Sequence, residues 1–194
     1  MFIYSITQIL FYLGFVVWIF PAIRQFRGRF FFYFFILAVA DPLTIILVLL
    51  FNINVGPMQP FLASALLVIS VLDIQYLKEN KYYVIIALTI VFIVALVFNN
   101  ATIYFSVIVL FHIFIFYYIL ILFIKKNVDE KAVNFFYIVL MLYELTNILK
   151  ISNLAFEITN ADEYHTLTSI FQVAIGLYFS LFRENSTRNF IKLQ

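Results

Sequence analysis

The sequence predicts an all-α integral membrane protein, a seven-transmembrane-helix bundle with its N-terminus outside and its C-terminus in the cytoplasm. Three observations lead to this prediction. The chain carries far fewer charged residues than a soluble protein of its size, it divides into seven long apolar segments, and its basic residues fall in every second connection between those segments.

The composition places most of the chain in lipid. Of the 194 residues, 65% are hydrophobic and 11% are charged, whereas a soluble domain carries about 25% charged residues. So little charge could not cover the surface of a water-soluble fold of this size. The net charge of +2 is too small to indicate a nucleic-acid partner, so we expect the lipid bilayer to be the main partner. The chain has no cysteine, which excludes disulfides, thiolate metal sites and cysteine nucleophiles.

Seven segments have the length and apolar character of membrane-spanning helices, which need about 20 mostly apolar residues. The first is longer than the core of a signal peptide and has no small-residue cleavage site after it, so we interpret it as a retained helix. The connections are short, which predicts a single domain over residues 1–194. The expected helices cover residues 2–20, 30–51, 58–77, 82–98, 102–124, 132–151 and 164–182.

The basic residues orient these helices. If the N-terminus lies outside and the connections alternate between the two faces, 11 of the 12 Lys and Arg residues fall on the cytoplasmic side and only Lys150 falls outside. Short loops rich in Lys and Arg remain in the cytoplasm, and six or eight helices would scatter these clusters. We therefore predict a multi-pass protein of the cell (plasma) membrane, which is the inner membrane where a cell has two.

Several polar side chains lie inside the predicted helices. A charged side chain at the centre of a spanning helix costs about 2.5–3.5 kcal/mol on insertion, so such residues usually face the interior of the bundle. A rise of about 1.5 Å per residue places five polar residues about 15–18 Å above the cytoplasmic ends of their helices. These five residues are Gln8, Asp41, His112, Glu144 and Gln172, and Asp73 lies nearer the cytoplasm.

We interpret this set as a candidate ligand- or proton-binding cluster, with Asp73 at its cytoplasmic mouth. Two acids and a histidine at one depth favour a proton or cation site, because Asn or Gln would join helices at a lower cost. The alternative is a structural role, since polar side chains in membrane bundles often only hold helices together, at about 0.6 kcal/mol per hydrogen bond. That alternative accounts well for Gln8 and Gln172.

The sequence predicts no catalytic residue, metal site or cofactor. The two histidines lie on different predicted helices and form no HExxH pattern, which argues against metal-dependent hydrolysis. No lysine lies midway along residues 164–182, as a retinal protein of the microbial kind would require. The chain shows no nucleophile motif and no Walker A or dinucleotide-binding motif.

Two functions remain open at this point. The first is a non-enzymatic accessory or sensory subunit that binds partner helices of other membrane proteins or a small hydrophobic ligand. Short loops and the lack of a catalytic motif favour it. The second is a small proton-coupled transporter or channel built around Asp41, His112 and Glu144. A membrane enzyme of an unrecognised kind is the least favoured reading.

Overall fold

The computed structural model describes residues 2–52, 56–98, 100–156, 161–186 and 189–192. These residues form seven α-helices and two short strands, which confirms the predicted all-helical architecture. The elements are α1 (Phe2–Arg24), α2 (Phe31–Phe51), α3 (Met58–Val71), α4 (Ile74–Phe98), α5 (Ala101–Glu130), β1 (Ala132–Asn134), α6 (Phe135–Phe156), α7 (Ala161–Leu181) and β2 (Phe190–Lys192).

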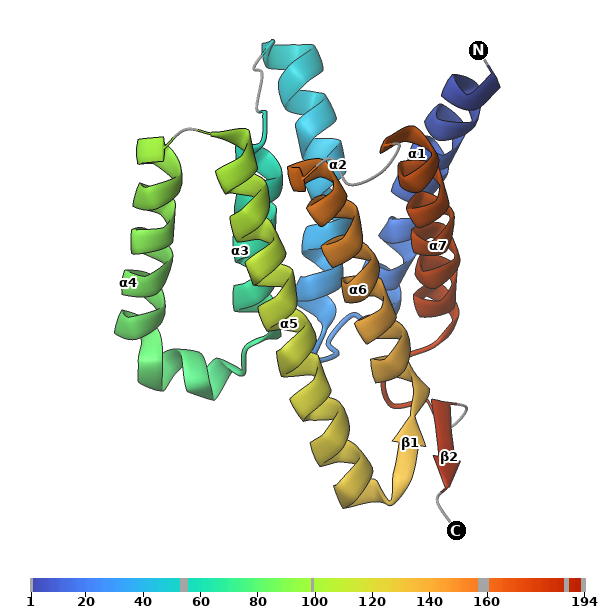
Figure 1. Cartoon of the computed structure of the whole chain (residues 1–194). Helices are drawn as coiled ribbons and strands as arrows, with labels where there is room; N and C mark the ends of the chain where they lie inside the picture. The colour runs from blue at the N-terminus through green and yellow to red at the C-terminus, as the bar shows by residue number, and fades with distance from the viewer. Residues whose placement is uncertain (1, 53–55, 99, 157–160, 187–188, 193–194) are drawn as a thin grey trace.

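Six of the helices form a closed ring. Each packs on the next in the order α1, α2, α3, α5, α6 and α7, and α7 returns to α1. α4 lies outside this ring and contacts the rest of the bundle mainly through α5 (Figure 1). The ring therefore has an interior to which every helix except α4 can contribute side chains.

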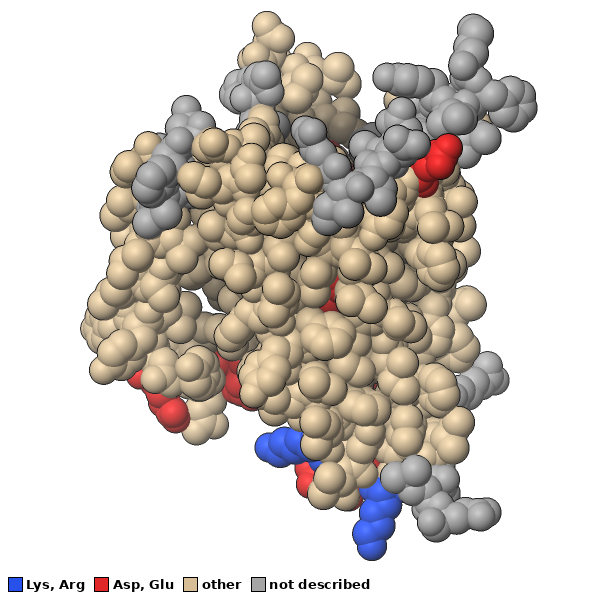
Figure 2. Space-filling view, viewed as in Figure 1, with Lys and Arg blue, Asp and Glu red and all other residues tan. Residues whose placement is uncertain are grey.

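Successive helices run in opposite directions, so the bundle has two distinct ends (Figure 1). α1 begins at the upper end of the view, and β1 and β2 pair antiparallel at the lower end, with Val133 opposite Ile191. The α1–α2, α3–α4 and α5–α6 connections also lie at the lower end. Figure 2 shows the Lys and Arg side chains of this face gathered at the lower end, below a middle region that is almost entirely uncharged.

Three helices among the described residues are long and apolar enough to cross a membrane: α2, α5 and α6. Their most apolar windows have a mean hydropathy of 2.6, 2.9 and 1.4, and between 11% and 33% of the residues in these windows are buried inside the protein. Apolar helices whose sides face outward in this way fit a lipid environment better than water. Two further apolar stretches, Tyr12–Arg24 and Met58–Val71, are shorter.

The end of α3 differs from the prediction of a helix over residues 58–77. α3 stops at Val71 because Leu72 adopts an extended conformation, with ψ of 146°. The Asp73 carboxylate then accepts a hydrogen bond from the backbone N–H of Gln75 at 2.8 Å, which is how an N-cap residue starts a new helix. α4 therefore begins at residue 74, and non-helical dihedrals at Asn80 divide it into a short first part and a long second part.

The start of the sixth helix also differs from the predicted range 132–151. Residues 132–134 form β1, and α6 begins at Phe135. The Asn134 side chain explains this boundary: its Oδ1 accepts the backbone N–H of Phe136 at 3.0 Å, and its Nδ2 donates to the Glu184 carbonyl at 3.1 Å. The same side chain thus caps α6 and ties it to the segment after α7.

Aromatic side chains form the core of the lower half of the ring. This aromatic core comes from the beginning of α2, the beginning of α6 and the end of α7, and its rings contact one another edge to face or tilted. A second, smaller cluster of Phe61, Tyr104 and Ile108 joins α3 to α5 nearer the upper end. The aromatic core consists of Phe30, Tyr33, Phe34, Phe136, Tyr137 and Phe179, all exposed by 2% or less.

Candidate functional site

A buried histidine and glutamate face each other at the centre of the ring. The Nδ1 atom of His112 on α5 lies 2.6 Å from Oε2 of Glu144 on α6, and Glu144 is fully buried. Both side chains sit on the inward faces of their helices, since the buried residues of α5 recur every three or four positions along the helix. The inward faces of α5 and α6 therefore bring the imidazole and the carboxylate into contact.

Two further side chains extend this pair to neighbouring helices. The Tyr33 hydroxyl on α2 donates a hydrogen bond to Oε1 of Glu144, and the Ser64 hydroxyl on α3 lies 3.3 Å from Nε2 of His112. The resulting chain of polar groups joins α3, α5, α6 and α2. Both ring nitrogens of His112 and both carboxylate oxygens of Glu144 are engaged, which meets the requirement that buried polar groups have partners.

A cavity of about 290 Å³ lies on the upper side of this pair. Its wall includes residues near the beginning of α3 and α5 and near the end of α6, which places the cavity between the middle of the ring and the upper end. The rest of the wall is largely apolar. The polar and charged side chains of the wall are Asp41, Gln59, Ser64, His112, Asn147, Lys150 and Gln172.

Part of the polar wall is held in place by hydrogen bonds between α6 and α7. Gln172 Nε2 donates to Asn147 Oδ1 at 2.7 Å, and Lys150 Nζ donates to Gln172 Oε1 at 3.3 Å. Glu144, Asn147 and Lys150 recur every three residues, so they lie along one stripe of α6. Asp41 faces the cavity from α2 and is exposed, which shows that the cavity is open rather than sealed.

The structure divides the residues that the sequence placed in one central cluster. His112 and Glu144 form the buried pair, whereas Asp41 and Gln172 line the cavity beside it. Gln8 lies on α1, but its side chain is outside the described part of the chain. Asp73 is exposed at the α3–α4 break and caps α4, so it does not stand at the mouth of the cluster.

Sequence reasoning missed five polar members of the site: Tyr33, Gln59, Ser64, Asn147 and Lys150. The alternation of the connections placed Lys150 on the outer side, and the structure shows that its side chain lines the cavity and bonds to Gln172. For Asn147 and Lys150 a signal was present, because both follow Glu144 at a spacing of three residues on one helix face. For Tyr33 and Ser64 there was none, since a tyrosine near a helix end and a serine within an apolar helix are common.

A second space, the α2–α3 groove, adjoins the cavity. It has a volume of about 490 Å³ and an almost wholly apolar wall. Three residues, Ala40, Gln59 and Ala63, line both the groove and the cavity. Gln59 Nε2 donates to the Ala40 carbonyl at 3.0 Å, so this hydrogen bond spans α2 and α3 where the two spaces meet. The wall of the groove consists of Phe35, Ile36, Val39, Ala40, Leu43, Leu47, Met58, Gln59, Leu62, Ala63 and Leu66.

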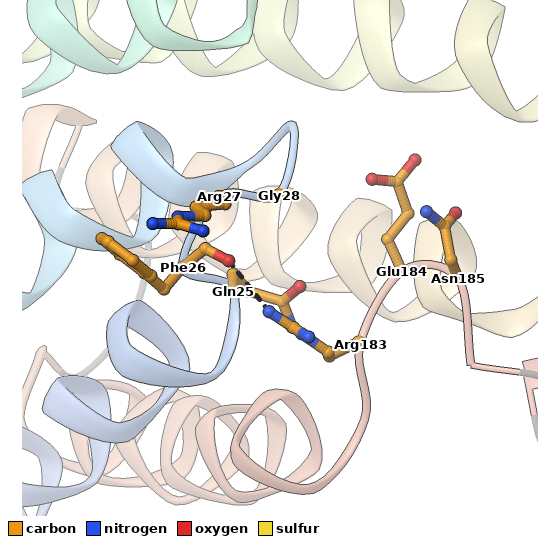
Figure 3. Close-up of a pocket in the computed structure, with 7 residues that line it drawn as sticks. All are labelled: Gln25, Phe26, Arg27, Gly28, Arg183, Glu184 and Asn185. Atoms are coloured by element: carbon orange, nitrogen blue, oxygen red, sulfur yellow. Dashed lines mark hydrogen bonds between the residues drawn. The ribbon is translucent and has the colours of Figure 1, made fainter.

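A polar pocket of about 550 Å³ lies at the lower end, between the α1–α2 connection and the segment after α7 (Figure 3). Figure 3 shows Arg183 pointing across it to the Phe26 carbonyl, to which Nη2 donates at 2.8 Å. Arg183 Nε also donates to the Arg24 carbonyl at 2.7 Å, and the buried Gln25 donates from Nε2 to the Phe182 carbonyl at 2.8 Å. These hydrogen bonds join α1 to the segment after α7, which accounts for the polar side chains in the wall of this pocket.

The space between the buried pair and the lower end is filled by the aromatic core. Tyr33 links the two, because its hydroxyl binds Glu144 while its ring contacts Phe30 and Phe34. Among the described residues, no group of three His, Asp or Glu side chains is placed to hold a metal ion.

Comparison with models of protein families, with curated proteins and with solved structures finds no match to this chain.

Proposed function

We propose that the protein is a seven-pass plasma-membrane protein that acts as a non-enzymatic sensory or accessory subunit and binds a small, mainly hydrophobic ligand in the cavity. The observation that carries this proposal is the one-sidedness of the interior. A cavity with polar and charged side chains in part of its wall lies in the upper half of the ring, and buried aromatic side chains form the core of the lower half. A ligand-binding site that opens toward one face of the membrane suits a receptor or regulatory subunit, whereas a transporter needs a path between both faces of the membrane.

The membrane placement is supported by helix length and by the distribution of charge. Besides α2, α5 and α6, helices α1 and α7 have 23 and 21 residues, which suffices for the hydrocarbon core at about 1.5 Å of rise per residue. The part of α4 after the break at Asn80 continues to Phe98 and covers about 27 Å. α3 has only 14 residues and covers about 21 Å. After α3, the first part of α4 carries Lys78, and Lys81 comes directly after the break at Asn80. Both lysines suit the membrane interface.

The orientation, with the N-terminus outside and the C-terminus cytoplasmic, is supported by the positions of the basic connections. The α1–α2, α3–α4 and α5–α6 connections all lie at the lower end (Figure 1). The first and the last of them contain Arg or Lys, and the short first part of α4, which follows the α3–α4 connection, carries Lys78. The positive-inside rule assigns such an end to the cytoplasm. The cavity then lies in the outer half of the bilayer, where a ligand from outside the cell or from the outer leaflet could reach it.

The second candidate is a proton-coupled transporter or channel, and the His112–Glu144 pair is the observation that favours it. Chains of His and acidic residues inside a membrane often relay protons. Here, however, the chain of hydrogen bonds passes from Glu144 to Tyr33, whose ring belongs to the aromatic core. Proton transfer to the cytoplasm would require these rings to separate.

Purified protein reconstituted alone into liposomes that contain a pH-sensitive dye distinguishes the two candidates. We expect proton leakage no faster than in protein-free liposomes. Leakage that depends on the protein and that Glu144→Gln abolishes would replace the proposal with the transporter.

A second experiment tests the subunit role directly. The tagged full chain, extracted from its native membranes in mild detergent, is expected to bring down a membrane protein in stoichiometric amount. A chain that copurifies with no partner and that responds to no ligand would contradict the proposed role.

A further inference from the structure

The cavity and the α2–α3 groove are adjacent spaces with a shared wall and different chemical characters. Ala40, Gln59 and Ala63 belong to both walls. The groove side is apolar, and the cavity side carries the charged and polar groups. Volumes of about 490 and 290 Å³ together lie within the range of about 300–1,000 Å³ that is usual for ligand sites. A ligand that fills both parts must be amphiphilic.

Opposite charges face each other across the polar part of this space. Asp41 lies on α2 and Lys150 on α6, and both line the cavity. The ion pairs formed among the described residues do not include one between them. Ionised side chains at membrane depth are costly without a partner. The hydrogen bond of Lys150 goes to the neutral Gln172 amide, so a ligand head that carries both charges would give Asp41 and Lys150 each a partner of opposite charge.

Resting on the function proposed above, we propose that the ligand is a zwitterionic single-chain amphiphile. Its cationic group binds Asp41, its anionic group binds Lys150, and its chain lies in the α2–α3 groove. The ligand enters sideways from the bilayer between α2 and α3. Gln59 releases the Ala40 carbonyl on entry, because their hydrogen bond spans the junction of groove and cavity.

The chain contains its own reporter for this event. Trp18 is the single tryptophan, and it lines the cavity with its ring centroid 4.6 Å from that of Tyr143. Bromine atoms quench indole fluorescence at contact distance. A bound amphiphile that carries bromine on the chain carbons nearest its head should therefore quench Trp18, and an unbrominated copy should restore the signal by competition.

The experiment titrates the full chain in detergent with three such brominated amphiphiles of equal chain length. Their heads are phosphoethanolamine (zwitterionic), phosphate (anionic) and glycerol (uncharged). We expect saturable quenching by the phosphoethanolamine compound, with an apparent dissociation constant at least tenfold lower than for either comparator. Asp41→Asn and Lys150→Met should each raise that constant at least tenfold. The matched control Glu163→Gln removes an exposed acid of α7 that lines neither space, and should leave the constant unchanged.

A substitution in the groove tests the position of the chain. Val39 lines the groove but not the cavity. Val39→Phe should weaken the binding of the brominated amphiphile at least tenfold and leave unchanged the binding of chainless phosphoethanolamine, measured by its ability to alter Trp18 emission. Unaltered thermal unfolding of each variant shows that it has folded.

The outcomes separate this inference from the proposed function. Equal quenching by the three heads, or quenching unaffected by Lys150→Met, would overturn the zwitterionic amphiphile and leave a ligand-binding subunit. Binding of chainless phosphoethanolamine alone would likewise overturn only the role of the groove. No saturable response to any probe would overturn the inference, and together with protein-dependent proton leakage it would overturn the proposed function as well.

Discussion

The upper and lower halves of the ring are built from the same helices but differ in chemistry and packing. In the lower half, fully buried rings of α2, α6 and α7 pack together, and Arg183 and Gln25 bind the backbone across the end of the bundle. In the upper half, a cavity and a groove separate the helices, and charged side chains line the space. The lower half holds the helices together, which leaves the upper half free to bind.

The buried pair forms the boundary between the halves. His112 contributes to the cavity wall, while Glu144 behind it binds Tyr33 of the aromatic core. A change in the cavity can therefore reach the lower half through a short series of direct contacts. The predictions below test how far the two halves differ, beginning with the largest expected effect.

Phe34→Ala should lower the free energy of unfolding by about 3–5 kcal/mol, because it leaves a cavity in the aromatic core. Its matched control is Leu50→Ala on the same helix, where the side chain is 74% exposed and a change within about 0.5 kcal/mol is expected. Unfolding of both variants in the same detergent measures the difference. Similar losses for the two would mean that the lower half is not the main source of stability.

Glu144→Gln should destabilise the protein by about 1–3 kcal/mol, because the amide nitrogen replaces one of the two acceptors used by His112 and Tyr33. Adding His112→Asn should cost less than the sum of the two single changes, since the residues are in contact. Unfolding of the two single variants and the double variant gives the coupling. Additive losses would show that the pair does not act as a unit.

Gly176→Ala should also destabilise the protein, because its new Cβ would lie 2.7 Å from Cγ1 of Val17. The cost of overpacking, about 1–3 kcal/mol, exceeds the gain in helix propensity of up to about 1 kcal/mol.

Gly14 on the facing helix is the matched position, with its nearest such neighbour 4.0 Å away. Gly14→Ala should therefore be neutral or stabilising. Thermal unfolding of both variants, and of Gly176→Ala with Val17→Ala as the expected rescue, measures the contrast. Equal tolerance at the two glycines would contradict the close approach of α1 and α7 near the lower end.

Asp73→Ala should have the smallest effect, a loss of about 0.5–1 kcal/mol typical of a helix cap. Hydrogen exchange should become faster in residues 74–80, where the cap acts, and binding to the cavity should be unaffected. A large loss of ligand binding with Asp73→Ala would return this residue to the site and contradict its position at the α3–α4 break.

The sequence is informative about the number of helices and about their inward faces. Long apolar segments follow from hydropathy, and the polar residues His112 and Glu144 indicate the inward faces of their helices. The rest of α5 is almost uniformly apolar, so the spacing of its buried residues could not be predicted. Boundaries set by single side chains are harder to predict. Apolar residues stand on both sides of Asp73, so hydropathy could not distinguish an acid buried within one helix from an acid that caps the next helix.

The site could be predicted only in part, because depth along a helix does not fix rotation about its axis. Counting residues brings Asp41, His112 and Glu144 to a similar level, yet only the last two touch. Lys150 was assigned to the outer interface by its position near a helix end. Its place in the cavity depends on the packing of α6 against α7, where its ammonium group donates a hydrogen bond to Gln172. A contact between two helices of this kind cannot be predicted from the sequence of either one.

Accessibility of a cysteine in the cavity tests the central claim, an interior open on one side only. The chain has no cysteine of its own, so Gln172→Cys provides a single reactive site in the cavity wall. A membrane-impermeant thiol reagent is applied to intact cells and to inside-out vesicles. The account predicts modification from the outside, slowed by a bound amphiphile, and none from the cytoplasmic side. Equal modification from the cytoplasmic side would contradict it.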